Sequence, residues 1–242
     1  MSPGDKSDDA MQIMKPTHPR ARKGKAANHK ARDLYTGHQI RIGVMGSAGG
    51  GMKSLVLTLC RQLGQAIAES GCCLLTGACP GLPHEAVLGA QKAGGHVVGI
   101  SPASSLKEHA ETFGSPYKEY DVLIFTGLGF MGRELVNIRS SDIVIVVGGR
   151  SGTLGEFAIA YESGKLIGVL TGTGGITAAL GAIQTSLNKE TGSEILYDAD
   201  PRQLVARLLK TYHSHIYVCP CHPASRAARS TKKSRTRVSV HE

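Results

Sequence analysis

The segment 143–156 is the part of this sequence that most restricts the possible fold. Ile143–Val147 is an unbroken β-branched run, which is typical of a strand covered on both faces in a parallel sheet. A glycine-rich turn follows at once, with Gly148, Gly149 and Gly152. A helix that starts after such a turn points its unpaired N–H groups and its positive dipole end into the space beyond the strand. The segment therefore predicts a strand, a turn and a helix that together bind phosphate.

The rest of the chain alternates strand-like and helix-like segments, which predicts an α/β fold: a single Rossmann-like, doubly wound parallel sheet with helices on both faces. Further strands are expected at 40–45, 72–75, 96–100, 121–125 and 166–170. Helices are expected at 53–70, 84–93, 176–187 and 201–212, with one more around Arg133. Ligands bind such sheets beyond the carboxyl ends of the strands. Glycine-rich turns fall at three of these ends, and their convergence predicts a nucleotide-like ligand: 46–51, 77–81 and 148–152.

The net charge of +9 comes from the two ends of the chain. Residues 1–37 carry eight Lys and Arg against four acids, and residues 223–242 carry six against one. We therefore expect disordered basic tails at 1–37 and 223–242, and a nucleotide-binding domain at 38–222. A nucleic-acid groove needs many basic residues on the folded body, whose charges here balance. Nucleic acid is thus expected to bind only weakly, through the tails.

Several other classes of protein and site are disfavoured. No stretch reaches the length of a membrane span and no apolar signal core is present, so we expect a cytoplasmic protein without a membrane partner. The loop that starts at Gly46 resembles an ATP-binding P-loop, but Met52 precedes Lys53 where that motif needs glycine. We assign no metal and no cofactor to the site. A soft-donor cluster near the end of the chain leaves metal binding there open: His213, His215, Cys219, Cys221 and His222.

The central motif resembles that of the "lonely guy" phosphoribohydrolases, once called lysine decarboxylases. Their signature is Pro-Gly-Gly-x-Gly-Thr-x-x-Glu, preceded by an arginine nine residues before the aspartate of a Ser-Asp pair. In this chain Arg133 and Ser141-Asp142 have that spacing, and the signature falls on Gly148, Gly149, Arg150, Gly152, Thr153 and Glu156. Gly148 replaces the proline and Arg150 a glycine, which makes the motif more similar to a neighbouring branch of nucleotide-binding proteins that includes molybdenum cofactor carriers.

This resemblance implies a hydrolase that cuts purine nucleoside 5′-monophosphates into free base and ribose 5-phosphate. Glu156 would orient the ribose or activate water, and Arg133 would hold the substrate or help the base depart. The phosphate and nucleotide contacts would come from Gly46, Ser47, Gly77, Gly148, Gly149, Arg150, Ser151, Gly152 and Thr153. The alternative is a non-catalytic carrier or sensor of a phosphate-bearing ligand, such as molybdenum cofactor or a nucleotide. Relatives of this kind imply a homo-oligomer.

The side chains in and before the motif are also compatible with structural roles. Thr153 and Glu156 have the spacing of a capping box, in which two side chains satisfy backbone N–H groups at the start of a helix. Arg139 competes with Arg133 for the ligand. Asp142, at the start of the central strand, is expected to be structural.

Overall fold

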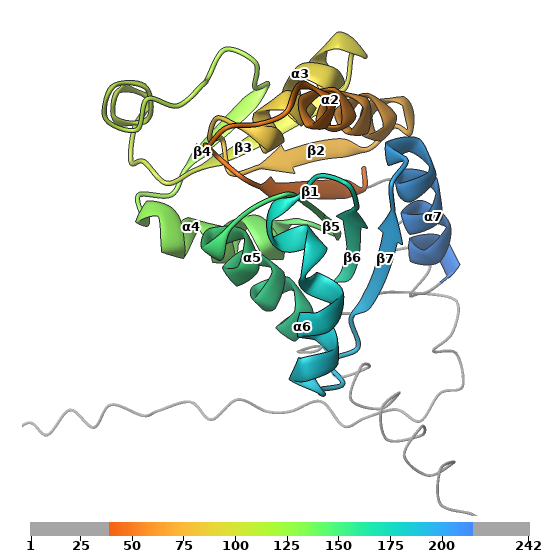
Figure 1. Cartoon of the computed structure of the whole chain (residues 1–242). Coiled ribbons are helices and arrows are strands. Elements are labelled where there is room, and N and C mark those ends of the chain that lie inside the picture. Colours follow the sequence, from red (N-terminus) through yellow and green to blue (C-terminus); the bar gives the residue numbers. More distant parts are fainter. Residues whose placement is uncertain (1–38, 215–242) are drawn as a thin grey trace, which may run out of the picture. The chain divides into compact units, whose positions relative to one another are not determined.

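Seven parallel strands make up the sheet of the computed structural model, which describes residues 39–214 (Figure 1). Across the sheet the strands lie in the order β4-β3-β2-β1-β5-β6-β7, and every neighbouring pair is parallel. Their bounds are β1 Arg41–Gly46, β2 Cys73–Thr76, β3 His96–Ser101, β4 Val122–Phe125, β5 Ile143–Val147, β6 Leu166–Leu170 and β7 Glu194–Asp198. The predicted Rossmann-like α/β fold is confirmed.

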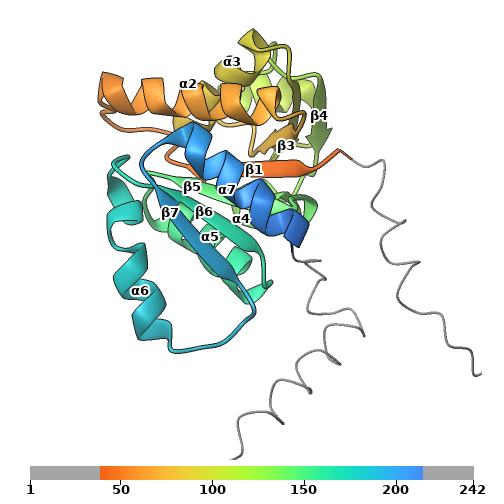
Figure 2. The same cartoon turned by 90° about the vertical axis from the view of Figure 1, so that its right-hand side faces the viewer.

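Helices cover both faces of this sheet. Helices α2 (Ser54–Glu69), α3 (Leu82–Lys92) and α7 (Pro201–Ser214) lie on one face (Figure 2). Helices α4 (Gly129–Ser140), α5 (Ser151–Glu162) and α6 (Leu180–Leu187) lie on the other (Figure 1). A hydrophobic cluster fills the space between the sheet and each layer. The chain is therefore doubly wound, with β1 and β5 at the centre.

The central position of β5 explains why its sequence is apolar throughout. Ile143, Ile145 and Val147 belong to the cluster under α2, α3 and α7, whereas Val144 and Val146 belong to the cluster under α5. The start of the strand is fixed by Asp142, which accepts hydrogen bonds from Arg41 N at 2.9 Å, Nε at 3.0 Å and Nη2 at 2.8 Å. Asp142 thus holds β1 against β5, in the structural role expected for it.

Three regions differ from the sequence-based expectation. The strand β7 was not predicted, because its half-buried sequence EILYD lacks the apolar run of the inner strands. The helix expected at 176–187 is divided into a 3-10 turn, Gly175–Ala178, and α6, which begins at Leu180. A π-helical turn at Glu108–Thr112 was also not predicted.

Some expectations concern residues outside the described range. The tails at 1–37 and 223–242 lie there, as do His215, Cys219, Cys221 and His222. Within residues 39–214, no helix is both long and apolar enough to cross a membrane. The cysteines of this range are buried free thiols: Cys60, Cys72, Cys73 and Cys79.

Candidate functional site

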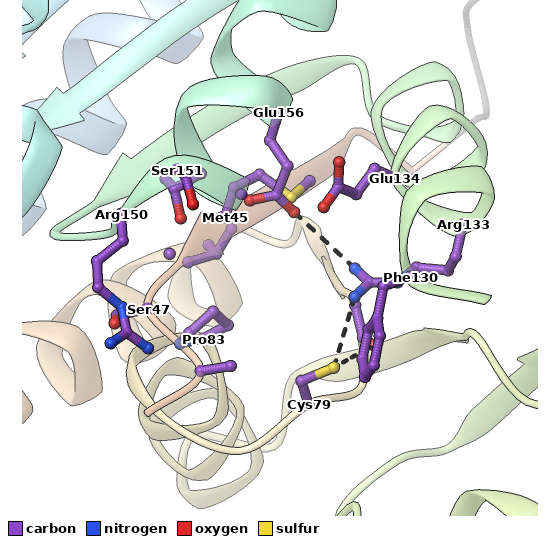
Figure 3. Close-up of a pocket in the computed structure, with 16 residues that line it drawn as sticks. Met45, Ser47, Cys79, Pro83, Phe130, Arg133, Glu134, Arg150, Ser151 and Glu156 are labelled. Atoms are coloured by element: carbon purple, nitrogen blue, oxygen red, sulfur yellow. Dashed lines mark hydrogen bonds and ion pairs between the residues drawn. The ribbon is translucent and has the colours of Figure 1, made fainter. Parts of the chain in front are cut away.

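A cavity of about 420 Å³ opens beyond the carboxyl ends of β1 and β5 (Figure 3). The chain leaves these neighbouring strands toward opposite faces of the sheet, and such a switch point leaves a crevice between the two outgoing loops. The loops after β1 and β2 are joined by a hydrogen bond from Leu82 N to Ser47 O at 2.9 Å. The cavity is lined by Val44, Met45, Gly46, Ser47, Ala48, Gly77, Cys79, Pro83, Phe130, Arg133, Glu134, Arg150, Ser151, Gly152, Thr153 and Glu156.

Most of the site residues expected from the sequence line this cavity, and two do not. Gly148 and Gly149 form the turn behind it, with φ angles of 54° and 95° that favour glycine. A β-carbon on Gly149 would also overlap the side chain of Thr153. Arg139, the competitor of Arg133, is exposed and lies outside the lining.

Sequence reasoning missed part of the lining. Met45 lies on β1, Cys79 in the turn after β2, and Phe130 and Glu134 on α4. The glycine-rich turn at 77–81 signals Cys79 indirectly, but the sequence offers no sign that Glu134 turns toward α5. In the structure, a β-carbon on Gly152 or Gly155 would lie 3.7 Å from a carboxylate oxygen of Glu134.

The amino end of α5 faces the cavity with unpaired backbone donors. The first backbone bond of the helix runs from Leu154 N to Arg150 O at 2.9 Å, so the N–H groups of residues 151–153 have no helical partner. Within residues 39–214, no side chain caps this end. Thr153 and Glu156 are the third and sixth residues of the helix, not its cap and third residue, and the capping-box interpretation is therefore wrong. The open end is suited to an anion.

Arg133 and Glu156 approach each other from α4 and α5 (Figure 3). Both are buried, with 6% and 7% of their surface exposed, and Arg133 Nη1 lies 3.9 Å from Glu156 Oε1. Arg133 Nη2 donates to Cys79 Sγ at 3.5 Å. A β-carbon on Gly77 would overlap the guanidinium, so this placement requires glycine in the turn after β2.

Burial makes the acidic groups of the cavity weak acids. It raises the pKa of Glu156 to about 8, an effect that Arg133 opposes and Glu134 reinforces. Burial also raises the pKa of Glu134 and that of the Cys79 thiol. At neutral pH Glu156 is therefore mainly a neutral acid, which can donate a hydrogen bond as well as accept one.

Comparison with known proteins gives a family and several similar structures. The sequence profile of the SLOG cluster4 family matches residues 39–205. An uncharacterized protein of Archaeoglobus fulgidus is 34% identical over 131 residues, which are 54% of this chain and 80% of that protein.

Two of the similar solved structures are proteins that carry or bind molybdenum cofactor. The molybdenum cofactor carrier protein MCP from Chlamydomonas reinhardtii is 31% identical, with a TM-score of 0.60 over 74% of this chain and 100% of that one. The molybdenum cofactor binding protein from the phototrophic bacterium Rippkaea orientalis is 31% identical, with a TM-score of 0.58 over 72% of this chain and 98% of that one.

Proposed function

This chain belongs to the SLOG cluster4 family, and we propose that it binds a phosphate-bearing small molecule as a non-catalytic carrier or sensor. The observation that carries the proposal is the uncapped amino end of α5, which opens into the cavity beside Arg150. Three unpaired N–H groups, the positive end of the helix dipole and a guanidinium together favour a phosphate group over any cation.

Molybdenum cofactor is our candidate ligand. It carries a phosphate, and a cavity of about 420 Å³ is within the usual range for sites that enclose a ligand of this size. The two molybdenum cofactor proteins named above are similar to this chain over almost their whole length. A nucleotide is the alternative ligand of the same chemical class.

The raised pKa of Glu156 is compatible with a carrier, and at neutral pH it does not supply the ionised carboxylate that the hydrolase role described for Glu156 needs. Cleavage of a glycosidic bond passes through an oxocarbenium-like state, which an ionised carboxylate stabilises. Because burial raises the pKa of Glu156 to about 8, most copies of the protein lack that negative charge at neutral pH. A neutral Glu156 suits a hydrogen bond to a bound ligand.

The hydrolase of purine nucleoside 5′-monophosphates is retained as a second candidate because Arg133 and Glu156 do meet in the cavity. A guanidinium beside a carboxyl group could hold a nucleotide and position water for attack on the ribose. On this hypothesis activity would rise toward pH 8, as Glu156 ionises.

One experiment separates the two candidates. The purified protein is analysed for co-purified pterin or nucleotide and is then incubated with AMP and other purine monophosphates, with chromatography for released base. The variant Glu156→Gln is run in parallel, and Glu162→Gln, on the exposed side of the same helix, is the control. A carrier retains its ligand and releases no base. Base released by the wild type and the control, but not by Glu156→Gln, would overturn the carrier proposal.

A further inference from the structure

The guanidinium of Arg133 is buried with too few acceptors. It has five N–H donors, yet its contacts in the described structure are a thiol, which is a weak acceptor, and a carboxyl oxygen at 3.9 Å, beyond hydrogen-bond range. Its Nε has no hydrogen-bond partner in the same structure. A buried charge is costly unless it is paired and hydrogen-bonded. The arrangement therefore suits an additional anionic acceptor.

The position of Arg133 is built into the fold. Gly77 leaves the space that the guanidinium occupies, and Cys79, two residues further along the same turn, accepts its Nη2–H. Figure 3 shows Arg133 and Cys79 on one side of the cavity, opposite Arg150 and Ser151. The cavity thus has a guanidinium on each of two sides. We name the Gly77, Cys79 and Arg133 group the arginine subsite, and Arg150 with the amino end of α5 the helix subsite.

We propose that the arginine subsite binds a second oxyanion group of the ligand whose phosphate occupies the helix subsite. This inference rests on the proposed function and makes it more specific: the ligand has a phosphate at one end and another anionic, oxygen-rich group at the other. A guanidinium is suited to such a group because its N–H donors match two oxygens at once.

The neighbouring acids are compatible with an anion there. Two ionised carboxylates beside Arg133 would repel a bound anion, but burial raises the pKa of both Glu156 and Glu134. A protonated Glu156 would instead donate its O–H to the oxyanion. Burial likewise raises the pKa of Cys79 and keeps the proton on its thiol, which therefore adds no negative charge.

The test is calorimetric titration of the full chain at pH 7 with sodium molybdate and, separately, with inorganic phosphate. We expect the wild type to bind the tetrahedral anions at two sites. Arg133→Met should lose one of them, with affinity there reduced by about tenfold or more, while Arg150→Ala should weaken the other. Arg139→Ala, an exposed arginine on α4, is the control and should leave both sites unchanged.

Gly77→Ala provides a second variant, because it displaces the guanidinium without removing its charge. It should also lose anion binding at the arginine subsite. Thermal melts establish that each variant is folded. One site that Arg150→Ala abolishes, and that neither Arg133→Met nor Gly77→Ala affects, would overturn this inference and leave the proposed function standing. If the wild type bound no oxyanion at all, the inference and the proposed phosphate site would both be overturned.

Discussion

Gly77 and Arg133 fit together so closely that a β-carbon on residue 77 would overlap Nη1, Cζ and Nη2 of the guanidinium. The two residues come from different elements, the turn after β2 and helix α4. Because Gly77 has no side chain, the turn after β2 leaves the space in which the Arg133 guanidinium lies.

The variant Gly77→Ala should therefore be less stable. A methyl group added there displaces the end of the Arg133 side chain and leaves the backbone in place, so the free energy of unfolding should fall by about 1 kcal/mol, the low end of the range for overpacked sites. Urea denaturation measures this cost. Gly181→Ala on α6 is the comparison: a β-carbon there meets nothing within 4 Å and alanine favours a helix over glycine, so this variant should be at least as stable as the wild type. Equal stability of the two variants would show that Arg133 is not held in this position.

Glu156 should make stability depend on pH. In the folded protein it keeps its proton up to about pH 8, whereas in the unfolded chain it ionises near its ordinary value of 4.5. Between these values the folded state binds more protons, so this group lowers the free energy of unfolding as pH rises. Glu156→Gln removes the effect, and its stability relative to wild type should increase across this window by a few kcal/mol. Denaturation at several pH values tests this, and parallel curves for the two proteins would contradict it.

Arg150→Ala should weaken phosphate binding. Loss of a charge-assisted hydrogen bond typically costs about tenfold or more in affinity, and the helix end that remains should still bind weakly. Titration with inorganic phosphate at two salt concentrations measures both the loss and its electrostatic origin. The same affinity in Arg150→Ala and Arg139→Ala would exclude Arg150 from the site.

Asp142→Ala should destabilise the fold and leave ligand binding intact. Its carboxylate accepts three hydrogen bonds from Arg41, and their loss should cost about 1–3 kcal/mol. Arg41→Ala should cost less, because the backbone N–H of residue 41 can still donate to Asp142. Calorimetric melting compares the two variants, and a change in ligand affinity on loss of Asp142 would refute its purely structural role.

Local sequence patterns were enough to predict much of the fold. The apolar run of β5 predicts a strand because every residue of that strand is buried. The glycines after it predict a turn because Gly148 and Gly149 adopt positive φ angles. The edge strand β7 escaped prediction since it is only half buried and its polar residues obscure the pattern.

The site residues named from the sequence are those in glycine-rich turns or in the family motif, and they include Gly46, Gly77 and Arg133 as well as the segment after β5. Thr153 and Glu156 belong to the motif itself, whereas Cys79 and Glu134 reach the cavity through packing between distant segments. The importance of Gly77 depends on Arg133, which lies 56 residues further along the chain, and no local pattern encodes that pair. The tails, the oligomeric state and the cellular compartment stay predictions.

The position of the cavity between β1 and β5 has a consequence for the dynamics of the sheet. The helix subsite follows β5, in the half of the sheet made of β5, β6 and β7. The opposite side of the cavity is formed by the turns after β1 and β2, which belong to the other half, and by the Arg133 guanidinium, which packs on the turn after β2. A ligand that contacts both would link the two halves across the β1–β5 seam. Hydrogen exchange of the amides in these two strands should then slow on binding, because the ligand stabilises the pairing of β1 and β5 against local opening.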